Sequence, residues 1–428
     1  MKNNSIIRRS ALAIGAITTL STAIYAGSSN VATPKPAAAA SDAPTFGLTG
    51  DWGGVRTSLF NSGISISSNY TGEFISNVSG GKARGGILEG LFKLSLDVNL
   101  EKAVGWQGAT FRVSTLTPHG SSPSAKFVGD SALVSNIDAN DALRLVDLWL
   151  EQRILEDKIS IKIGQMRVDD EFGVTDTAGM FLNSNFGVPS IAAPTMPVPN
   201  YPVGALGVRV RVEPIKGLYG QVGLYDGNSS PSEIADPTNG SLGRASRHGT
   251  DWAFRSSEGV LWATEVGYQR CCDEYPGAIR LGFLHHTDET ASLKPGDNPH
   301  SYNNSGYFVI DQTIWQKSGA PKEGLSAFLR GITSKESRNV QAHSVQLGTT
   351  FTGIATSDDK LGVAWARTRF SRYVAGIPSN ESILELTYQY PVNSYLKVQP
   401  DIQYVRNPGQ NRAYSSAWVA GVRAVLEF

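Results

Sequence analysis

The chain contains 428 residues, and its 38 lysine and arginine residues are balanced by 38 aspartate and glutamate residues. When residues 1–26 are set aside, 35 cations remain against 38 acids, a formal charge of −3, which does not suit a nucleic-acid-binding protein. The mean hydropathy is −0.17, and no run of about eighteen apolar residues occurs after the N-terminus. These values exclude a helical membrane protein but allow a β-barrel, whose strands are only half apolar.

The N-terminus has the pattern of an export signal. Lys2, Arg8 and Arg9 precede an uncharged apolar stretch at residues 11–25, which predicts a secretory signal peptide over residues 1–26. Cleavage after Ala26 and cleavage within the small-residue run 37–40 both fit the sequence. Residues 27–46 are rich in Ala, Ser and Pro and predict a flexible segment. Residues 47–63 predict a short periplasmic helical segment capped by Asp51.

The remainder, 64–428, shows repeated period-two alternation. At residues 88–100, apolar Leu88, Leu94 and Leu96 alternate with Glu89 and Lys93, as in a strand with lipid on one face and a wet lumen on the other. The prediction is an all-β transmembrane antiparallel barrel with sixteen strands, short periplasmic turns and long extracellular loops. The predicted strands are 64–76, 87–100, 108–116, 142–153, 158–167, 204–214, 217–226, 258–270, 277–287, 306–316, 323–333, 342–353, 359–369, 381–391, 395–406 and 415–428.

The predicted connections alternate in length. Long segments are expected after the first, third, fifth, seventh and ninth strands, including 117–141, 168–203, 227–257 and 288–305. If a long loop folds inward it constricts the channel, and the candidates are 117–141 and 168–203. The last strand, 418–428, ends at the aromatic Phe428, which is how outer-membrane barrels end, and it predicts recognition by the barrel-assembly machinery. The apolar outer face suits membrane lipid or a neighbouring barrel, so the sequence fits both a single barrel and a homotrimer.

Other residue groups give little support to enzymatic or metal chemistry. The sequence has no HExxH, GxSxG, Walker or GxGxxG signature placed for catalysis. Cys271 and Cys272 are adjacent and cannot build a disulfide framework. His285 and His286 precede acidic residues, but neighbouring strand residues point to opposite faces and cannot readily share one ion. We therefore predict no enzyme activity, no cofactor and no metal.

Several motifs resemble the OprB-type carbohydrate-selective porins, and the similarity extends from about residue 47 to the C-terminus. It is carried by residues 50–57 (GDWGGVRT), 70–73 (YTGE), 148–152 (LWLEQ), 381–388 (ESILELTY) and 399–404 (QPDIQY). The resemblance implies a sixteen-stranded outer-membrane barrel that passes monosaccharides and related small polyols by facilitated diffusion. No cofactor is implied.

The alternation also predicts which polar side chains face the lumen. Lumen groups of both signs can replace the water around a neutral sugar without strong preference for an ion, so a small neutral carbohydrate is the expected solute, and a general or weakly anion-selective porin is the alternative. The candidate pore-lining residues are Lys93, Asp97, Arg112, Asp147, Glu151, Lys162, Asp169, Asp170, Glu265, Arg280, Arg330 and Glu385, and the same pattern turns Arg209, Arg211, Gln399, Asp401 and Arg423 inward.

Overall fold

The structure is a computed structural model, and it describes residues 46–187, 196, 198–227, 248–270, 275–298, 300–374, 380–409 and 411–428. The predicted signal peptide, nearly all of the predicted flexible segment 27–46, and the cysteine pair at 271 and 272 lie outside the described residues. Among the described residues, no helix is long and apolar enough to cross a bilayer.

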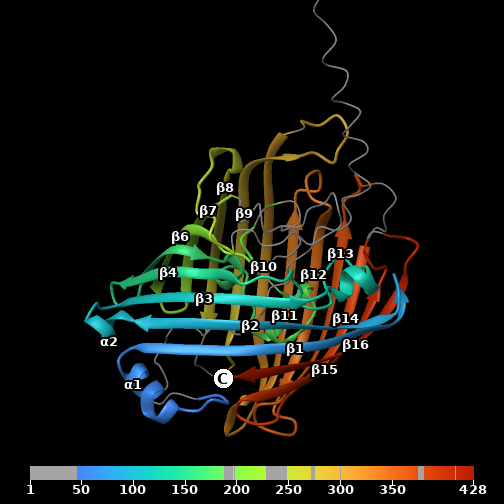
Figure 1. The fold of residues 1–428 in the computed structure, drawn as a ribbon. Helices are drawn as coiled ribbons and strands as arrows, with labels where there is room; N and C mark the ends of the chain where they lie inside the picture. Colours follow the sequence, from blue (N-terminus) through green and yellow to red (C-terminus); the bar gives the residue numbers. More distant parts are fainter. Residues whose placement is uncertain are drawn as a thin grey trace, which may run out of the picture.

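Sixteen antiparallel strands close into a barrel (Figure 1), which confirms the predicted fold class. Each strand pairs with its neighbour in sequence, and β1 closes the barrel against β16 with Glu73 opposite Arg423. The strands are β1 (Ile64–Gly81), β2 (Gly85–Asn99), β3 (Ala109–Gly120), β4 (Arg144–Ile154), β5 (Ile159–Met166), β6 (Ala205–Ile215), β7 (Leu218–Asp226), β8 (Val260–Arg270), β9 (Gly277–Ala291), β10 (His300–Lys317), β11 (Ala320–Ser334), β12 (Gln341–Thr352), β13 (Lys360–Phe370), β14 (Asn380–Pro391), β15 (Leu396–Arg406) and β16 (Ser415–Glu427).

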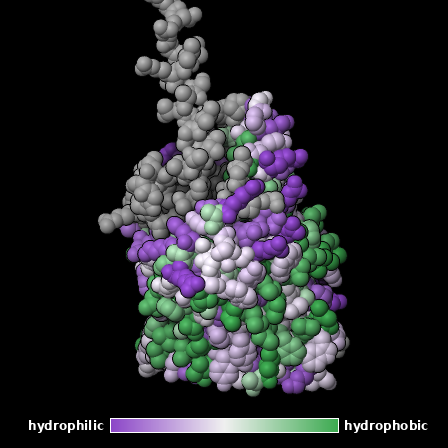
Figure 2. Space-filling model, turned by 90° about the vertical axis from the view of Figure 1, so that its right-hand side faces the viewer, coloured by the Kyte–Doolittle hydropathy of each residue, from purple (hydrophilic) through white to green (hydrophobic). Residues whose placement is uncertain are grey.

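The predicted alternation is present in the structure. In β2, Leu88 is 74% exposed while the next residue, Glu89, is 5% exposed, so the apolar side chains point out of the barrel and the charged ones point in. A barrel in water would show the opposite preference, because exposed apolar surface is costly there. Apolar side chains gather over the lower part of the wall shown in Figure 2, and hydrophilic ones gather above them. The outer face is thus suited to hydrocarbon.

The helices are short and lie at strand ends or within loops. A 3₁₀ turn η2 (Trp52–Gly54) leads into α1 (Val55–Asn61), and α2 (Leu100–Val104) follows β2. The predicted cap by Asp51 takes a different form, because its carboxylate accepts hydrogen bonds from the backbone N–H and the hydroxyl of Thr57 at 2.8 and 2.9 Å. The loops contain η3 (Ser124–Val128), η4 (Val168–Asp170), η5 (Thr177–Met180), η6 (Ser184–Phe186) and η7 (Ser256–Glu258).

Arg56 on α1 ties the N-terminal segment to the last strand. Its guanidinium donates to the backbone carbonyls of Ile66 and Phe428 at 3.3 and 3.2 Å. The same group lies 5.1 Å from the ring centre of Phe46 and 5.0 Å from that of Trp52. One side chain therefore connects the N-terminal segment with the C-terminal residue.

Replacing Arg56 with alanine is expected to loosen residues 46–62, because hydrogen bonds from a charged donor contribute about 1.5–3 kcal/mol each. Limited proteolysis should cut this segment faster in the variant, and the melting temperature of the barrel should fall by a few degrees. Arg56→Lys is the matched control, since it keeps the charge but loses the planar fork. Equal cleavage rates for Arg56→Ala and the unaltered protein would contradict this role.

The long connections are fewer than the sequence predicts. β1 and β2 are joined by residues 82–84 alone, and β9 and β10 extend so far that only 292–299 separate them. The prediction of long loops after the first and ninth strands is therefore wrong, because the strands continue through residues 77–81, 288–291 and 300–305, which the sequence pattern assigns to loops. The long connections are 121–143, 167–204 and 227–259, and the structure describes only the ends of the third.

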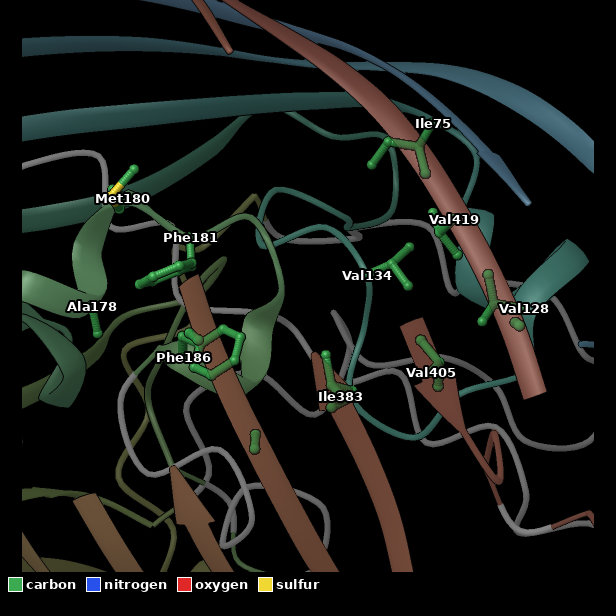
Figure 3. Close-up of a cluster of buried hydrophobic side chains, with 14 of the residues drawn as sticks. Ile75, Val128, Val134, Ala178, Met180, Phe181, Phe186, Ile383, Val405 and Val419 are labelled. Carbon is green, nitrogen blue, oxygen red and sulfur yellow. The ribbon is translucent and has the colours of Figure 1, made fainter. Parts of the chain in front are cut away.

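Two of these connections fold into the barrel and carry much of its buried apolar surface. Phe181 and Phe186 of the β5–β6 loop lie with ring centres 5.1 Å apart, and Phe328 of β11 lies 6.1 Å from Phe181. Ile383 of β14 and Val419 of β16 belong to the same buried cluster (Figure 3). The buried apolar side chains thus lie inside the barrel, between its loops and the wall. This cluster faces β11–β16 and β1, a second one faces β4–β11, and a third one faces β2–β4.

Candidate functional site

Inward carboxylates on the wall hold the two folded-in loops in place. Glu385 of β14 accepts backbone N–H groups of Leu182 and Asn183 at 2.6 and 3.0 Å. Asp311 of β10 accepts the Thr177 N–H at 3.0 Å and the Thr175 hydroxyl at 3.1 Å. Because loop N–H groups buried without a partner are costly, these carboxylates fix the path of the β5–β6 loop across the lumen.

Further wall residues support the same loop and its neighbour. Glu265 of β8 accepts the Gly173 N–H and the Tyr307 hydroxyl, each at 2.7 Å. Arg330 of β11 donates to the carbonyl of Asn185 at 3.1 Å. For the β3–β4 loop, Glu381 of β14 accepts the Ser131 N–H at 3.0 Å. Both loops are thus bonded to strands on the far side of the barrel.

Four of the predicted pore-lining residues are therefore buried rather than open to the lumen. Glu385 is 0% exposed, Arg330 1%, Glu265 2% and Arg280 6%, and Arg280 donates to the Tyr219 hydroxyl at 3.2 Å. The alternation correctly turned them inward. It could not show that a loop from elsewhere in the chain would cover Glu385, Arg330 and Glu265. No local pattern records a contact between residues 182 and 385.

The loops leave an open cavity of about 840 Å³ against the other half of the wall. Its lining comes from β1–β6, from α1 and α2, and from the turns at 156–158 and 213–217. Of the predicted residues it includes Asp97, Arg112, Glu151, Lys162 and Asp170. Volumes of about 300–1,000 Å³ are usual for small-molecule sites, so one small solute could be accommodated.

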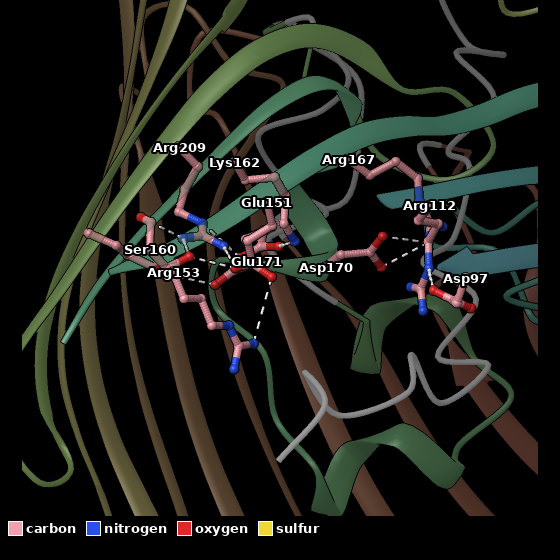
Figure 4. A network of polar contacts seen from close by, with 11 residues as sticks. Asp97, Arg112, Glu151, Arg153, Ser160, Lys162, Arg167, Asp170, Glu171 and Arg209 are labelled. Atoms are coloured by element: carbon pink, nitrogen blue, oxygen red, sulfur yellow. Dashed lines mark hydrogen bonds and ion pairs between the residues drawn. The ribbon is translucent and has the colours of Figure 1, made fainter. Parts of the chain in front are cut away.

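The charged side chains of the cavity form opposed pairs (Figure 4). On one side of the network Arg209 lies 2.7 Å from an oxygen of Glu151 and 3.1 Å from an oxygen of Glu171, and Lys162 also pairs with Glu171. Although burial raises it, the pKa of the Glu171 carboxyl is held below its ordinary value by the positive charges of Lys162 and Arg209.

On the other side of the network, two arginines pair with aspartates. Arg112 of β3 donates to Asp97 of β2 at 2.6 Å, and Arg167, directly after β5, lies 2.7 Å from Asp170. The salt bridges cancel most of the local charge while leaving oriented N–H and carboxylate groups along the wall. Such a surface can exchange hydrogen bonds with a neutral polyhydroxylated solute.

Trp149 of β4 stands between the two sides of the network. The guanidinium carbon of Arg112 lies 5.4 Å from the centre of the indole, and the Lys162 ammonium lies 4.1 Å from it. Trp149 was not among the predicted site residues. Its position between Asp147 and Glu151 places it on the inward face of β4, but the candidate list contains charged residues only.

The remaining predicted residues lie outside the lining of this cavity. Asp147 is 2% exposed and accepts a hydrogen bond from the Ser114 hydroxyl, and Asp169 accepts the Tyr201 N–H at 3.3 Å. Lys93 is 8% exposed on β2. Arg167, Ser160 and Glu171 also line the cavity but were not among the candidate pore-lining residues, although Glu171 directly follows the predicted Asp169 and Asp170.

Asp138 gives the β3–β4 loop a dependence on pH. It is 1% exposed, and burial, together with the charge of Glu73, raises the pKa of its carboxyl to about 7 although the Ser122 hydroxyl donates to it. Because the folded pKa lies above the ordinary value of 3.8, the folded protein binds the extra proton and stability falls as pH rises between these values.

We therefore expect amides of the β3–β4 loop to exchange faster at pH 8 than at pH 6 after correction for intrinsic rates. Asp138→Asn should remove most of this difference, because the amide stays neutral across the range. Hydrogen exchange read by mass spectrometry measures it, with Asp141, an acid near the end of the same loop, changed to asparagine as the control. The same pH dependence in Asp138→Asn and the unaltered protein would refute this assignment.

The two histidines have separate polar partners. The Nδ1 atom of His285 lies 2.6 Å from the side-chain oxygen of Asn304, and the Nε2 atom of His286 lies 2.7 Å from the Gly227 carbonyl. Within the part of the chain that the structure describes, no three His, Cys, Asp or Glu side chains are grouped so that they could hold a metal ion.

Comparisons with known proteins agree with this architecture. The chain is 27% identical to Porin B of Pseudomonas aeruginosa, with 89% of this chain and 91% of that protein covered. It is 22% identical to the putative porin QuiX of Acinetobacter baylyi, with 89% and 93% covered. The high-pH structure of Pseudomonas putida OprB superposes with a TM-score of 0.80 at 23% identity, covering 91% of this chain and all of that one.

The low-pH structure of the same Pseudomonas putida protein gives a TM-score of 0.58 at 19% identity, with the same coverage. The model of a carbohydrate-selective porin family, OprB, matches residues 83–428. Membership in a family of porins, rather than any missing motif, supports the prediction that the protein is not an enzyme. With its closed barrel and its polar cavity, the chain belongs to the OprB family of carbohydrate-selective porins and is a sugar channel of the bacterial outer membrane.

Proposed function

We propose that the channel is selective for monosaccharides and related small polyols, and that solutes pass through the cavity on the β1–β6 side of the lumen. The observation that carries this proposal is the pairing of opposite charges along the wall of the cavity, as in Arg112 with Asp97 and Arg209 with Glu151. A wall that is polar but nearly neutral favours an uncharged solute with many hydroxyl groups over an ion of similar size.

A weakly anion-selective porin is the second candidate. Nine lysines and arginines but seven aspartates and glutamates line the cavity, and a small positive excess attracts anions. Lys102 and Lys216 contribute to that excess at the end of the cavity near α1 and the β6–β7 turn. The two candidates differ in how they treat a charged sugar.

Liposome swelling separates them. Vesicles containing the purified protein should admit glucose, arabinose and glycerol quickly, admit disaccharides slowly, and exclude gluconate, which matches glucose in size but carries a negative charge. Gluconate entering faster than glucose would favour the anion porin. Disaccharides entering as fast as glucose would rule out the proposed selectivity.

We infer the arrangement in the cell from the same features. The end of the barrel that carries α1 and the short turns faces the periplasm, and the long loops reach the outside. Residues 1–26 are removed as a signal peptide, 27–46 form a flexible segment, 47–63 a periplasmic helical segment, and 64–428 the channel. The barrel-assembly machinery recognises strand β16 with Phe428, and lipid covers the outer face. Native mass spectrometry can test whether three barrels associate.

A further inference from the structure

Three arginines form a positive patch on the outside of the barrel, at the ends of β13 and β15. Arg367, Arg369 and Arg406 are exposed, whereas their neighbours Thr368 and Val405 are buried inside the wall at 1% and 0% exposure. The alternation of exposure therefore turns all three guanidinium groups away from the lumen. We refer to Arg367, Arg369 and Arg406 as the outer arginine patch.

The register places these arginines close to one another. Arg367 lies opposite Ser382 of β14, and Ser382 lies opposite Arg406 of β15, so Arg367 and Arg406 are at one level and two strands, about 10 Å, apart. Arg369 follows Arg367 by two residues on the same face, about 7 Å further along the strand. The patch spans a width comparable to that of a lipid headgroup.

No acidic side chain accompanies the patch on the outer face of β12–β15 as the structure describes it. The buried carboxylates of these strands, Glu381, Glu385 and Asp401, are 0%, 0% and 3% exposed and lie on the lumen side. Glu336 interacts electrostatically with Arg369, but its carboxylate already accepts hydrogen bonds from the side chain and the backbone N–H of Arg372 at 2.8 and 2.9 Å. The outer arginine patch thus keeps a net positive charge.

The wall next to the patch, toward the middle of the barrel, is apolar. Val345, Val363, Leu384 and Ile402 lie on the same outer face and are 44–49% exposed. A charged side chain is least costly on the outer face of a membrane barrel where it reaches the headgroup level. Apolar surface below and cations above match an amphiphile with acyl chains and a negatively charged head.

We propose that the outer arginine patch binds the phosphate groups of a phosphorylated glycolipid in the outer leaflet of the membrane. Guanidinium groups bind phosphate oxygens in pairs of parallel hydrogen bonds, and the acyl chains lie on the apolar wall beside them. The assignment to the outer leaflet rests on the outer-membrane location and on the proposed orientation, with this end of the barrel outside. It does not depend on which solute the channel carries.

Native mass spectrometry of the full chain in detergent tests this site with diphosphorylated lipid A as the probe. The triple variant Arg367→Gln, Arg369→Gln, Arg406→Gln should bind the lipid at least about tenfold more weakly, since each arginine contributes separately to binding an anionic headgroup. The matched control is Arg270→Gln, Lys317→Gln, Lys322→Gln, which removes three cations from the opposite end of the wall and should bind normally. Sugar entry into liposomes should be equal in all three proteins.

Three results would overturn the proposal. Equal lipid binding by the outer triple variant and the unaltered protein would remove these arginines from the site. Equal binding of dephosphorylated and diphosphorylated lipid A by the unaltered protein would show that only the acyl chains are held, and this arm stands even if the variant fails to fold. Loss of binding in the control triple variant would show unspecific attraction to positive charge.

Discussion

Replacing Glu385 with alanine is expected to widen the channel without unfolding the barrel. The Glu385 carboxylate accepts the N–H groups of Leu182 and Asn183, which lie next to the aromatic cluster of the β5–β6 loop. Without it these two buried donors lose their partner, at about 1–3 kcal/mol each, and the loop can recover that energy only by moving toward water. The barrel strands keep their own pairing, so the loss falls on the loop.

The measurements are single-channel conductance and liposome swelling with a disaccharide, and both should rise in Glu385→Ala. Glu385→Gln keeps an acceptor oxygen and should give an intermediate result. Leu386→Ala alters the next residue, which is 46% exposed on the outer face, and should leave both readings unchanged. A folded Glu385→Ala protein that still excludes disaccharides would show that the loop is held by other contacts, such as those of Asp311.

Replacing Arg209 with alanine is expected to lower the positive excess of the cavity lining from two charges to one and to shift its ion preference toward cations. Arg209 is 2% exposed and lies between Glu151 and Glu171 at 2.7 and 3.1 Å. Removing one partner of a buried ion pair costs about 3–5 kcal/mol, and here it leaves Lys162 on Glu171 and Arg153, at 3.6 Å from Glu151, to offset the two carboxylates. Potassium should then enter the cavity more readily, relative to chloride, than it does in the unaltered protein.

The reversal potential in a gradient of potassium chloride measures this change. Glucose entry into liposomes should also fall, because bound cations compete with glucose for the carboxylate groups of the cavity wall. The matched control is Glu151→Gln with Glu171→Gln, which leaves Arg209 and Lys162 unopposed and should move the reversal potential the other way. If both variants shift it in the same direction, the charges of this network do not set the ion preference.

The fold could be predicted almost completely from the sequence because the signal is local. In each strand the side chains alternate between lipid and lumen, so the polarity of a residue such as Leu384 or Glu385 indicates which face it lies on. All sixteen predicted strands are present. The largest error in a strand start lies at β10, which begins at His300 rather than at 306. That end carries polar residues, Asn303 and Asn304, which the pattern assigned to a loop.

The candidate site was only partly predictable because it depends on contacts between distant residues. Local alternation turns Arg112 and Arg330 inward alike, yet one lines the cavity and the other is covered by the β5–β6 loop. The difference arises from the packing of Phe181 and Phe186 on the wall of β11–β14. No periodicity within a strand encodes where a loop from another part of the chain comes to rest.

The inner wall of the barrel has two kinds of surface, because the loops cover most of it and the cavity lies at the end of β1–β6 near α1 and α2. Inward positions from β8 to β16 serve mainly as a seat for the loops, so mutations there should act through folding and through the width of the passage. Inward positions near the α1 end of β2–β6, such as Asp97 and Arg112, line the cavity, whereas Leu91 and Leu116, nearer the other end, pack on the β3–β4 loop. A new substrate preference could therefore be engineered on one arc of the wall while the opposite arc keeps the channel narrow.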